Sequence, residues 1–127
     1  MAKILVVDDS EILRKELRAL LVKNNHEVIE AVDGIDGIDK SLNHPDIALI
    51  ILDFNMPRVD GITMLCKLND DPNYEKKPVF MLTTERNDEL KAIGKKVGVL
   101  AWILKPFHPT KLLNIVEKIL QKYPKAG

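Results

Sequence analysis

The sequence predicts an α/β fold in which a doubly wound, five-stranded parallel sheet is covered by helices on both faces. Short apolar runs alternate with segments of helical spacing, and this alternation is typical of right-handed βαβ crossovers. Most of the runs lack the polar alternation of a half-solvated strand, so we expect central strands buried on both faces. The runs span residues 3–7, 27–31, 47–52, 79–82 and 100–104.

The first half of the chain supplies three of the strands and two helices between them. Ser10 is a candidate N-cap for a helix that follows the run at 3–7. The run at 27–31 is the only one with acids spaced along it, which predicts an edge strand. Both helical segments place apolar residues three and four positions apart, as amphipathic helices do. These residues are Leu13, Leu17, Leu20 and Leu21 in the first helix, and Ile35, Ile38 and Leu42 in the second.

The second half repeats the pattern with three further helices. Asp60 and Gly61 indicate the start of the third helix, and Pro109 suits the first turn of the last one. The same apolar spacing recurs in all three segments. The residues are Leu65 and Leu68 in the third helix, Leu90, Ile93 and Val97 in the fourth, and Leu112, Leu113, Val116, Ile119 and Leu120 in the fifth.

Composition favours one domain over residues 1–127 with a single core, since 46% of the residues are hydrophobic and 30% are charged. Nineteen basic and nineteen acidic residues cancel, so charge gives no argument for a nucleic-acid or membrane partner. The apolar runs are far shorter than the roughly 20 residues of a membrane helix. Cys66 is the only cysteine, which excludes an internal disulfide and predicts a cytoplasmic protein with Cys66 as a small core residue.

Three acids follow two of the buried strands. Asp8 and Asp9 come directly after the run at 3–7, and Asp53 follows the run at 47–52. The carboxyl ends of parallel strands meet at one edge of the sheet, where ligands bind in such folds. Three carboxylates repel one another unless a cation lies between them, and oxygen ligands suit Mg²⁺. The sequence therefore predicts a magnesium site at this edge.

Two further strands end in polar residues, because Thr83 follows the fourth run and Lys105 follows the fifth. Taken singly, each of these residues has a plainer explanation: the aspartates as helix caps or turn residues, Thr83 as a strand residue, Lys105 as a solvated lysine. Their convergence on one edge favours a functional site. The three histidines lie in separate loops without the spacing of a metal site, so we expect surface side chains for His26, His44 and His108.

At these residues the chain resembles the receiver domain of two-component response regulators, most closely the stand-alone chemotaxis (CheY-like) type. The resemblance covers essentially the whole chain. It implies a flavodoxin-like sheet of strand order 2-1-3-4-5, a single receiver domain and a cis peptide bond before Pro106. The motifs that carry it are Val6-Val7-Asp8-Asp9-Ser10, Leu52-Asp53-Phe54-Asn55-Met56-Pro57, Gly61, Thr83 and Lys105-Pro106-Phe107.

The resemblance implies that Asp53 accepts a phosphoryl group. A carboxylate that attacks an anionic phosphorus needs positive charge beside the transferred group, and Mg²⁺ and Lys105 would supply it. By the same resemblance, the Mg²⁺ ligands are Asp8, Asp9, Asp53 and the backbone carbonyl of Asn55, and the phosphoryl-binding groups are Thr83, Thr84 and Lys105.

Other positions are expected to tune and transmit the signal. Asn55 and Glu85 match family positions that set the lifetime of the phosphoryl group, and Trp102 stands where the family has a switching Tyr or Phe. Lysines on the fourth and fifth helices recur at helical spacing and predict a basic output face. They are Lys91, Lys95, Lys111, Lys118 and Lys122.

The function that these observations favour is a signalling switch that is not an enzyme and acts as a monomer. A histidine kinase or phosphotransfer protein would phosphorylate it, and a downstream protein, such as a flagellar motor switch or another effector, would read it before autodephosphorylation. One alternative is a haloacid-dehalogenase phosphatase, but that family needs a titratable Asp where Asn55 stands. The other is a phosphorylation-independent adaptor, which has no need of repelling acids.

Overall fold

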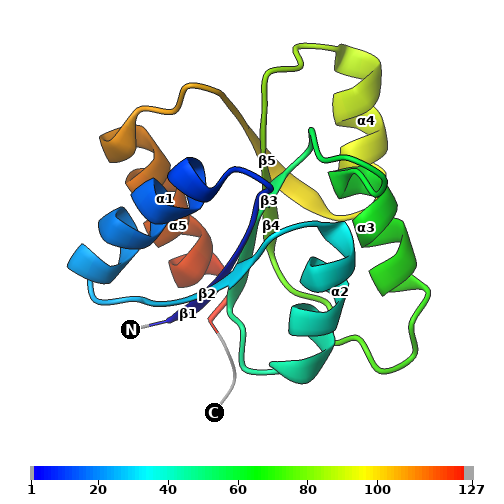
Figure 1. The fold of residues 1–127 in the computed structure, drawn as a ribbon, viewed down its shortest axis with the longest axis horizontal. Helices are drawn as coiled ribbons and strands as arrows, with labels where there is room; N and C mark the ends of the chain where they lie inside the picture. The colour runs from blue at the N-terminus through cyan, green and yellow to red at the C-terminus, as the bar shows by residue number, and fades with distance from the viewer. Residues whose placement is uncertain (1, 125–127) are drawn as a thin grey trace.

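The chain folds into a parallel sheet covered by helices on both faces (Figure 1), and the computed structural model describes residues 2–124. The strand order is β2-β1-β3-β4-β5, as expected. The strands are β1 (Lys3–Val7), β2 (Glu27–Ala31), β3 (Leu49–Asp53), β4 (Val79–Thr83) and β5 (Val99–Leu104). The helices are α1 (Glu11–Lys23), α2 (Gly34–Asn43), α3 (Gly61–Asn69), α4 (Asp88–Lys96) and α5 (Pro109–Lys122).

The core consists of two layers, one on each face of the sheet. Helices α1 and α5 cover one face, and α2, α3 and α4 lie on the other (Figure 1). Because successive side chains of a strand point to opposite faces, Leu5 belongs to one layer and Val6 to the other. Every residue of β3 and β4 is buried, which confirms the prediction of central strands. Each fully buried aliphatic side chain stabilises the fold by about 1.5–3 kcal/mol.

Local signals place the helix starts that surround the carboxyl edge of the sheet. The hydroxyl of Ser10 accepts a hydrogen bond from the backbone N–H of Leu13, and the carboxylate of Asp60 accepts one from Thr63. Pro109 stands in the first turn of α5. Caps of this kind contribute about 1 kcal/mol each. They also set the point at which the chain turns from each strand end into the next helix.

Several side chains lie where the sequence did not predict them. Cys66 is exposed, because the buried face of α3 is formed by Met64, Leu65 and Leu68. Ile35 and Ile93 follow the apolar spacing of their helices but are 59% and 48% exposed. Helices α2 and α4 therefore bury narrower faces than a full amphipathic stripe.

His26 is a further correction, since we expected it at the surface and it is 9% exposed. Its Nδ1 accepts a hydrogen bond from the backbone N–H of Ala2 at 3.3 Å, and its Nε2 lies 2.7 Å from a carboxylate oxygen of Glu117. The imidazole thus joins the loop before β2 to α5. His44 is half-buried and His108 is exposed. No helix within residues 2–124 is long and apolar enough to cross a membrane.

Strand β2 is an edge strand, as its acids predicted, and Glu30 ties it to α1. The carboxylate of Glu30 accepts hydrogen bonds from Nε of Arg14 at 3.1 Å and from Nε of Arg18 at 2.6 Å. Burial opposes ionisation of Glu30, but the two guanidinium groups outweigh it and lower the pKa of the carboxyl. The charged form is therefore favoured in the folded state.

We predict that Glu30→Gln lowers the free energy of unfolding at neutral pH by less than about 1 kcal/mol, because the pair is partly solvated. A lowered pKa stabilises the fold above the unfolded pKa of 4.5, and the contribution is lost as the pH falls through the folded value. Urea unfolding at neutral and strongly acidic pH measures this difference. Glu27→Gln, in the same strand but more exposed, is the control. An effect of equal size at both pH values would contradict the prediction.

Candidate functional site

The predicted acids meet at the carboxyl edge of the sheet. Asp8 follows β1, and Asp53 is the last residue of β3, the strand beside it. One carboxylate oxygen from each of Asp8, Asp9 and Asp53 can be chosen so that all three lie within 4.8 Å of one another. Asp8 and Asp53 are each 1% exposed, whereas Asp9 is exposed to solvent. The set offers only oxygen ligands and opens outward through Asp9, so it fits a hard divalent cation such as Mg²⁺.

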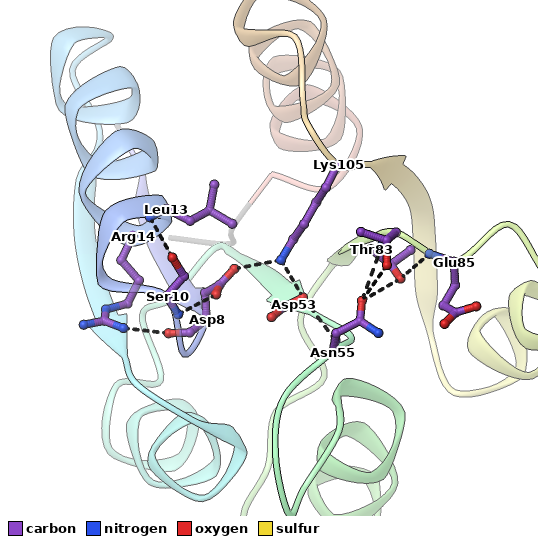
Figure 2. A network of polar contacts seen from close by, with 10 residues as sticks. Asp8, Ser10, Leu13, Arg14, Asp53, Asn55, Thr83, Glu85 and Lys105 are labelled. Atoms are coloured by element: carbon purple, nitrogen blue, oxygen red, sulfur yellow. Dashed lines mark hydrogen bonds and ion pairs between the residues drawn. The ribbon is translucent and has the colours of Figure 1, made fainter.

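The start of α1 holds Asp8 in place (Figure 2). Its carboxylate accepts a hydrogen bond from the backbone N–H of Ser10 at 2.8 Å, and its backbone carbonyl accepts one from Nη1 of Arg14 at 2.8 Å. Arg14 also bonds Glu30 of β2, so the acid is connected to the edge of the sheet. Arg14 was not predicted from the sequence, because nothing in its local pattern marks a contact with a residue six positions earlier.

Lys105 lies directly over the two buried acids. Its Nζ is 2.8 Å from Oδ1 of Asp53 and 3.4 Å from Oδ2 of Asp8 (Figure 2). The peptide bond between Lys105 and Pro106 is cis, as expected. Burial lowers the pKa of Lys105, but its bonds to Asp53 and Asp8 outweigh burial and raise that pKa. The ammonium therefore stays charged and lies beside the carboxylate of Asp53.

The site carries more negative than positive charge, and the raised pKa of Asp8 shows this most clearly. Burial raises the pKa of Asp8 from 3.8 to about 6, and the negative charge of Asp53 adds to this effect. The Ser10 N–H and the charge of Lys105 act in the opposite direction without cancelling it. Three carboxylates against one bound ammonium leave the pocket short of positive charge, which a cation would correct.

A second group of bonds joins the ends of β3 and β4. The side-chain oxygen of Asn55 accepts hydrogen bonds from the Thr83 hydroxyl at 3.2 Å and from the backbone N–H and hydroxyl of Thr84 at 3.5 Å each. The backbone N–H of Asn55 donates to Oδ1 of Asp53 at 3.1 Å, and that of Glu85 donates to the Thr83 hydroxyl oxygen at 2.9 Å. Thr83 and Thr84, two of the three residues expected to bind a phosphoryl group, are thus in contact with Asn55.

Gly61 lets α3 begin close to Asp53. A Cβ atom at this position would lie 2.8 Å from Sδ of Met81 and 3.0 Å from the carbonyl oxygen of Asp53. Its backbone N–H donates to the carbonyl of Phe54 at 3.2 Å. A side chain here would push the helix away from the strand end, so glycine is required by the close approach.

The remaining predicted residues lie outside this network. Trp102 is half-buried on β5, and its ring centroid is 6.5 Å from that of Phe54. The predicted output lysines are all exposed, but the two helices that carry them cover opposite faces of the sheet (Figure 1). Lys91 and Lys95 are on α4, and Lys111, Lys118 and Lys122 are on α5.

We predict that Asp8→Asn stabilises the protein when divalent cations are removed with EDTA. The raised pKa means that the folded state loses stability as the pH rises from 3.8 to about 6, because the unfolded chain ionises first. The variant should gain about 1–3 kcal/mol of unfolding free energy at mildly alkaline pH and nothing at strongly acidic pH, where Asp8 is protonated in both states.

Thermal unfolding in EDTA across the pH range measures this gain. Asp39→Asn is the matched control, because Asp39 is exposed on α2. A gain that does not change with pH would show that the repulsion and desolvation of Asp8 are not its cause.

Comparison with known proteins identifies relatives of this chain. The family model of the response regulator receiver domain matches residues 4–117. The chain is 34% identical over 119 residues to the chemotaxis protein CheY homolog of Campylobacter jejuni, covering 93% of this chain and 92% of the relative. It is also 34% identical to chemotaxis protein CheY1 of Helicobacter pylori, with 93% and 96% covered.

A solved structure agrees with these sequence relatives. The chemotaxis response regulator CheY4 of Vibrio cholerae has a TM-score of 0.85 and 37% identity to this chain, with 94% of this chain and 99% of CheY4 covered. Family model, sequence relatives and structure all point to the same group of proteins. The chain belongs to the response regulator receiver domains and is of the CheY type.

Proposed function

We propose that this receiver domain works as a cytoplasmic, monomeric signalling switch in which Asp53 is the phosphoacceptor. A histidine kinase or phosphotransfer protein donates the phosphoryl group, and a downstream protein reads the result. The observation that carries the proposal is the buried Asp53 carboxylate with the Lys105 ammonium 2.8 Å away. A buried carboxylate beside a fixed cation, at the edge of a parallel sheet, is suited to receive an anionic group.

Asp8, Asp9, Asp53 and the backbone carbonyl of Asn55 would hold Mg²⁺, which supplies positive charge beside the transferred phosphoryl group. The Ser10 N–H orients Asp8 for this role, and the exposed position of Asp9 leaves the site accessible from solvent. The donor set contains no sulfur or nitrogen atom, which favours Mg²⁺ over softer metals.

In the transfer step, an oxygen of Asp53 forms the new bond to phosphorus while the bond from phosphorus to the donor histidine nitrogen breaks. The bonding electrons leave with the imidazole. Lys105 neutralises charge on the phosphoryl oxygens, and the hydroxyl of Thr83 and the N–H of Thr84 donate to them. Water later hydrolyses the acyl phosphate, and Asn55 and Glu85 flank its path and set the lifetime.

The change that the downstream protein reads begins at Thr83, which is fully buried and lies beside β5. When its hydroxyl moves toward the phosphoryl group, the space near Trp102 changes, and the face formed by α4, β5 and α5 changes with it. The exposed lysines on α4 and α5 favour an acidic amphipathic target, such as a segment of a flagellar motor switch or another effector.

The alternative activities are less well supported. A haloacid-dehalogenase phosphatase needs a general acid two residues after its nucleophile, and Asn55 cannot titrate. A phosphorylation-independent adaptor gains nothing from two buried carboxylates that repel each other. We therefore expect no turnover of small phosphate esters.

Self-phosphorylation tests the phosphoacceptor. We predict that acetyl phosphate adds one phosphoryl group, that EDTA prevents the addition, and that Asp53→Asn and Asp53→Ala abolish it. Intact-mass spectrometry detects the adduct. Asp39→Asn should be modified like the parent, because Asp39 is exposed on α2 and outside the acid cluster. An adduct that survives either Asp53 substitution would contradict the assignment.

A second experiment tests the output face. We predict that Mg²⁺ with beryllofluoride, which mimics the phosphoryl group, changes the fluorescence of Trp102 and the amide chemical shifts of residues 88–122. Trp102 is the only tryptophan, so its emission reports on this position alone. Asp53→Ala with the same additions should give no response. If the parent binds beryllofluoride at Asp53 and neither signal changes, this output face is wrong.

A further inference from the structure

Helix α4 has an unusual buried surface, because Gly94 is its only buried residue. Leu90 is half-buried and Ile93 is 48% exposed, so the larger apolar side chains of the helix hold it only weakly to the sheet. Glycine within a helix disfavours folding by about fivefold relative to alanine. The backbone of Gly94 does not need glycine, since the positive φ of this segment belongs to Gly98. The reason for glycine at position 94 must therefore be steric.

The neighbour of Gly94 is the indole of Trp102. A Cβ atom on Gly94 would lie 2.4 Å from Cζ2 of Trp102, 3.2 Å from Cε2 and 3.4 Å from Nε1. The first distance is impossible for two carbon atoms in contact, so the indole occupies the space that any other residue would fill. At Gly94, α4 therefore lies directly against the indole of β5.

Trp102 is also connected to the candidate site by the register of the sheet. Met81 pairs with Trp102, and Thr83 pairs with Leu104, so Thr83 and Trp102 project from the same face of the sheet, two register positions apart. Phe54 directly follows Asp53 in the sequence, and the centroid of its ring lies 6.5 Å from the centroid of the Trp102 ring. The sheet register and the Phe54 ring thus both place residues of the candidate site near the indole.

We propose that Gly94 is the positioning residue for Trp102, and that the pair makes the docking of α4 depend on where the indole lies. In the resting protein, the indole ring occupies the space left by the missing side chain of Gly94. When the ring moves, α4 loses the contact of its only buried residue and shifts or loosens. The steric part concerns the resting protein, and the coupling to Asp53 rests on the function proposed above.

A double-mutant cycle without Mg²⁺ tests the steric part. In the parent, Gly94→Ala should lower the folding equilibrium constant about tenfold or more, although alanine is the better helix former. In the Trp102→Phe background, which lacks the second ring, the same substitution should raise that constant by up to about fivefold. Ala92→Gly, at an exposed position of the same helix, gives the ordinary effect of glycine in α4.

Hydrogen exchange gives a readout that general destabilisation would not mimic. Gly94→Ala should speed exchange of the α4 amides by a larger factor than exchange of the β1 and β3 amides, whose protection falls only as far as global stability does. If Gly94→Ala does not fold and Gly94→Ala with Trp102→Phe does, the steric clash is supported. Stabilisation by Gly94→Ala in both backgrounds, or failure of both variants to fold, overturns the proposal.

The coupling is tested by adding Mg²⁺ and beryllofluoride. Exchange of the α4 amides should change in the parent together with Trp102 fluorescence, and should change less in Trp102→Phe. An equal change in α4 in both proteins overturns the dependence on the indole. If the parent protein binds no beryllofluoride, this result contradicts the assignment of Asp53 as phosphoacceptor. The result of the double-mutant cycle without Mg²⁺ is not affected by it.

Discussion

The burial of two neighbouring carboxylates, Asp8 and Asp53, is the constraint on which the rest of the site depends. Burying an ionised carboxylate is unfavourable by several kcal/mol, and a second one nearby adds to it. Lys105 bonds both acids, yet the pKa of Asp8 is still raised to about 6. The resting site is therefore electrostatically strained in a way that a bound cation relieves.

The fold holds these charges together because their partners come from separate strands of one rigid sheet. Asp8 and Asp53 end neighbouring strands, while Thr83 and Lys105 come from the next two. Asn55 then joins the second half of the site to the first, since its backbone bonds Asp53 and its side chain bonds Thr83. In the resting state the Thr83 hydroxyl thus has an acceptor, and an anionic phosphoryl oxygen would be a stronger one.

Glycines at two helix contacts determine how closely α3 and α4 approach the sheet. Gly61 allows α3 to begin against Met81 and the carbonyl of Asp53, and Gly94 allows α4 to lie against Trp102. Both contacts are too close for a Cβ atom, so a larger residue at either position would push the helix away from its partner. Helices α1 and α5, by contrast, pack against the sheet through buried leucine, valine and isoleucine side chains.

The sequence by itself determined the strand order through its family resemblance, the edge position of β2, the caps at Ser10 and Asp60, and the meeting of the acids with Lys105. Apart from the strand order, these features follow from periodicity, from the spacing of acids, from local capping and from the rule that parallel strands end at one edge. Only the tertiary structure decided the burial of His26, the exposure of Cys66 and the contacts of Asn55 and Gly94. Those depend on how elements distant in sequence pack against each other, and side-chain directions and helix approach carry no local signal.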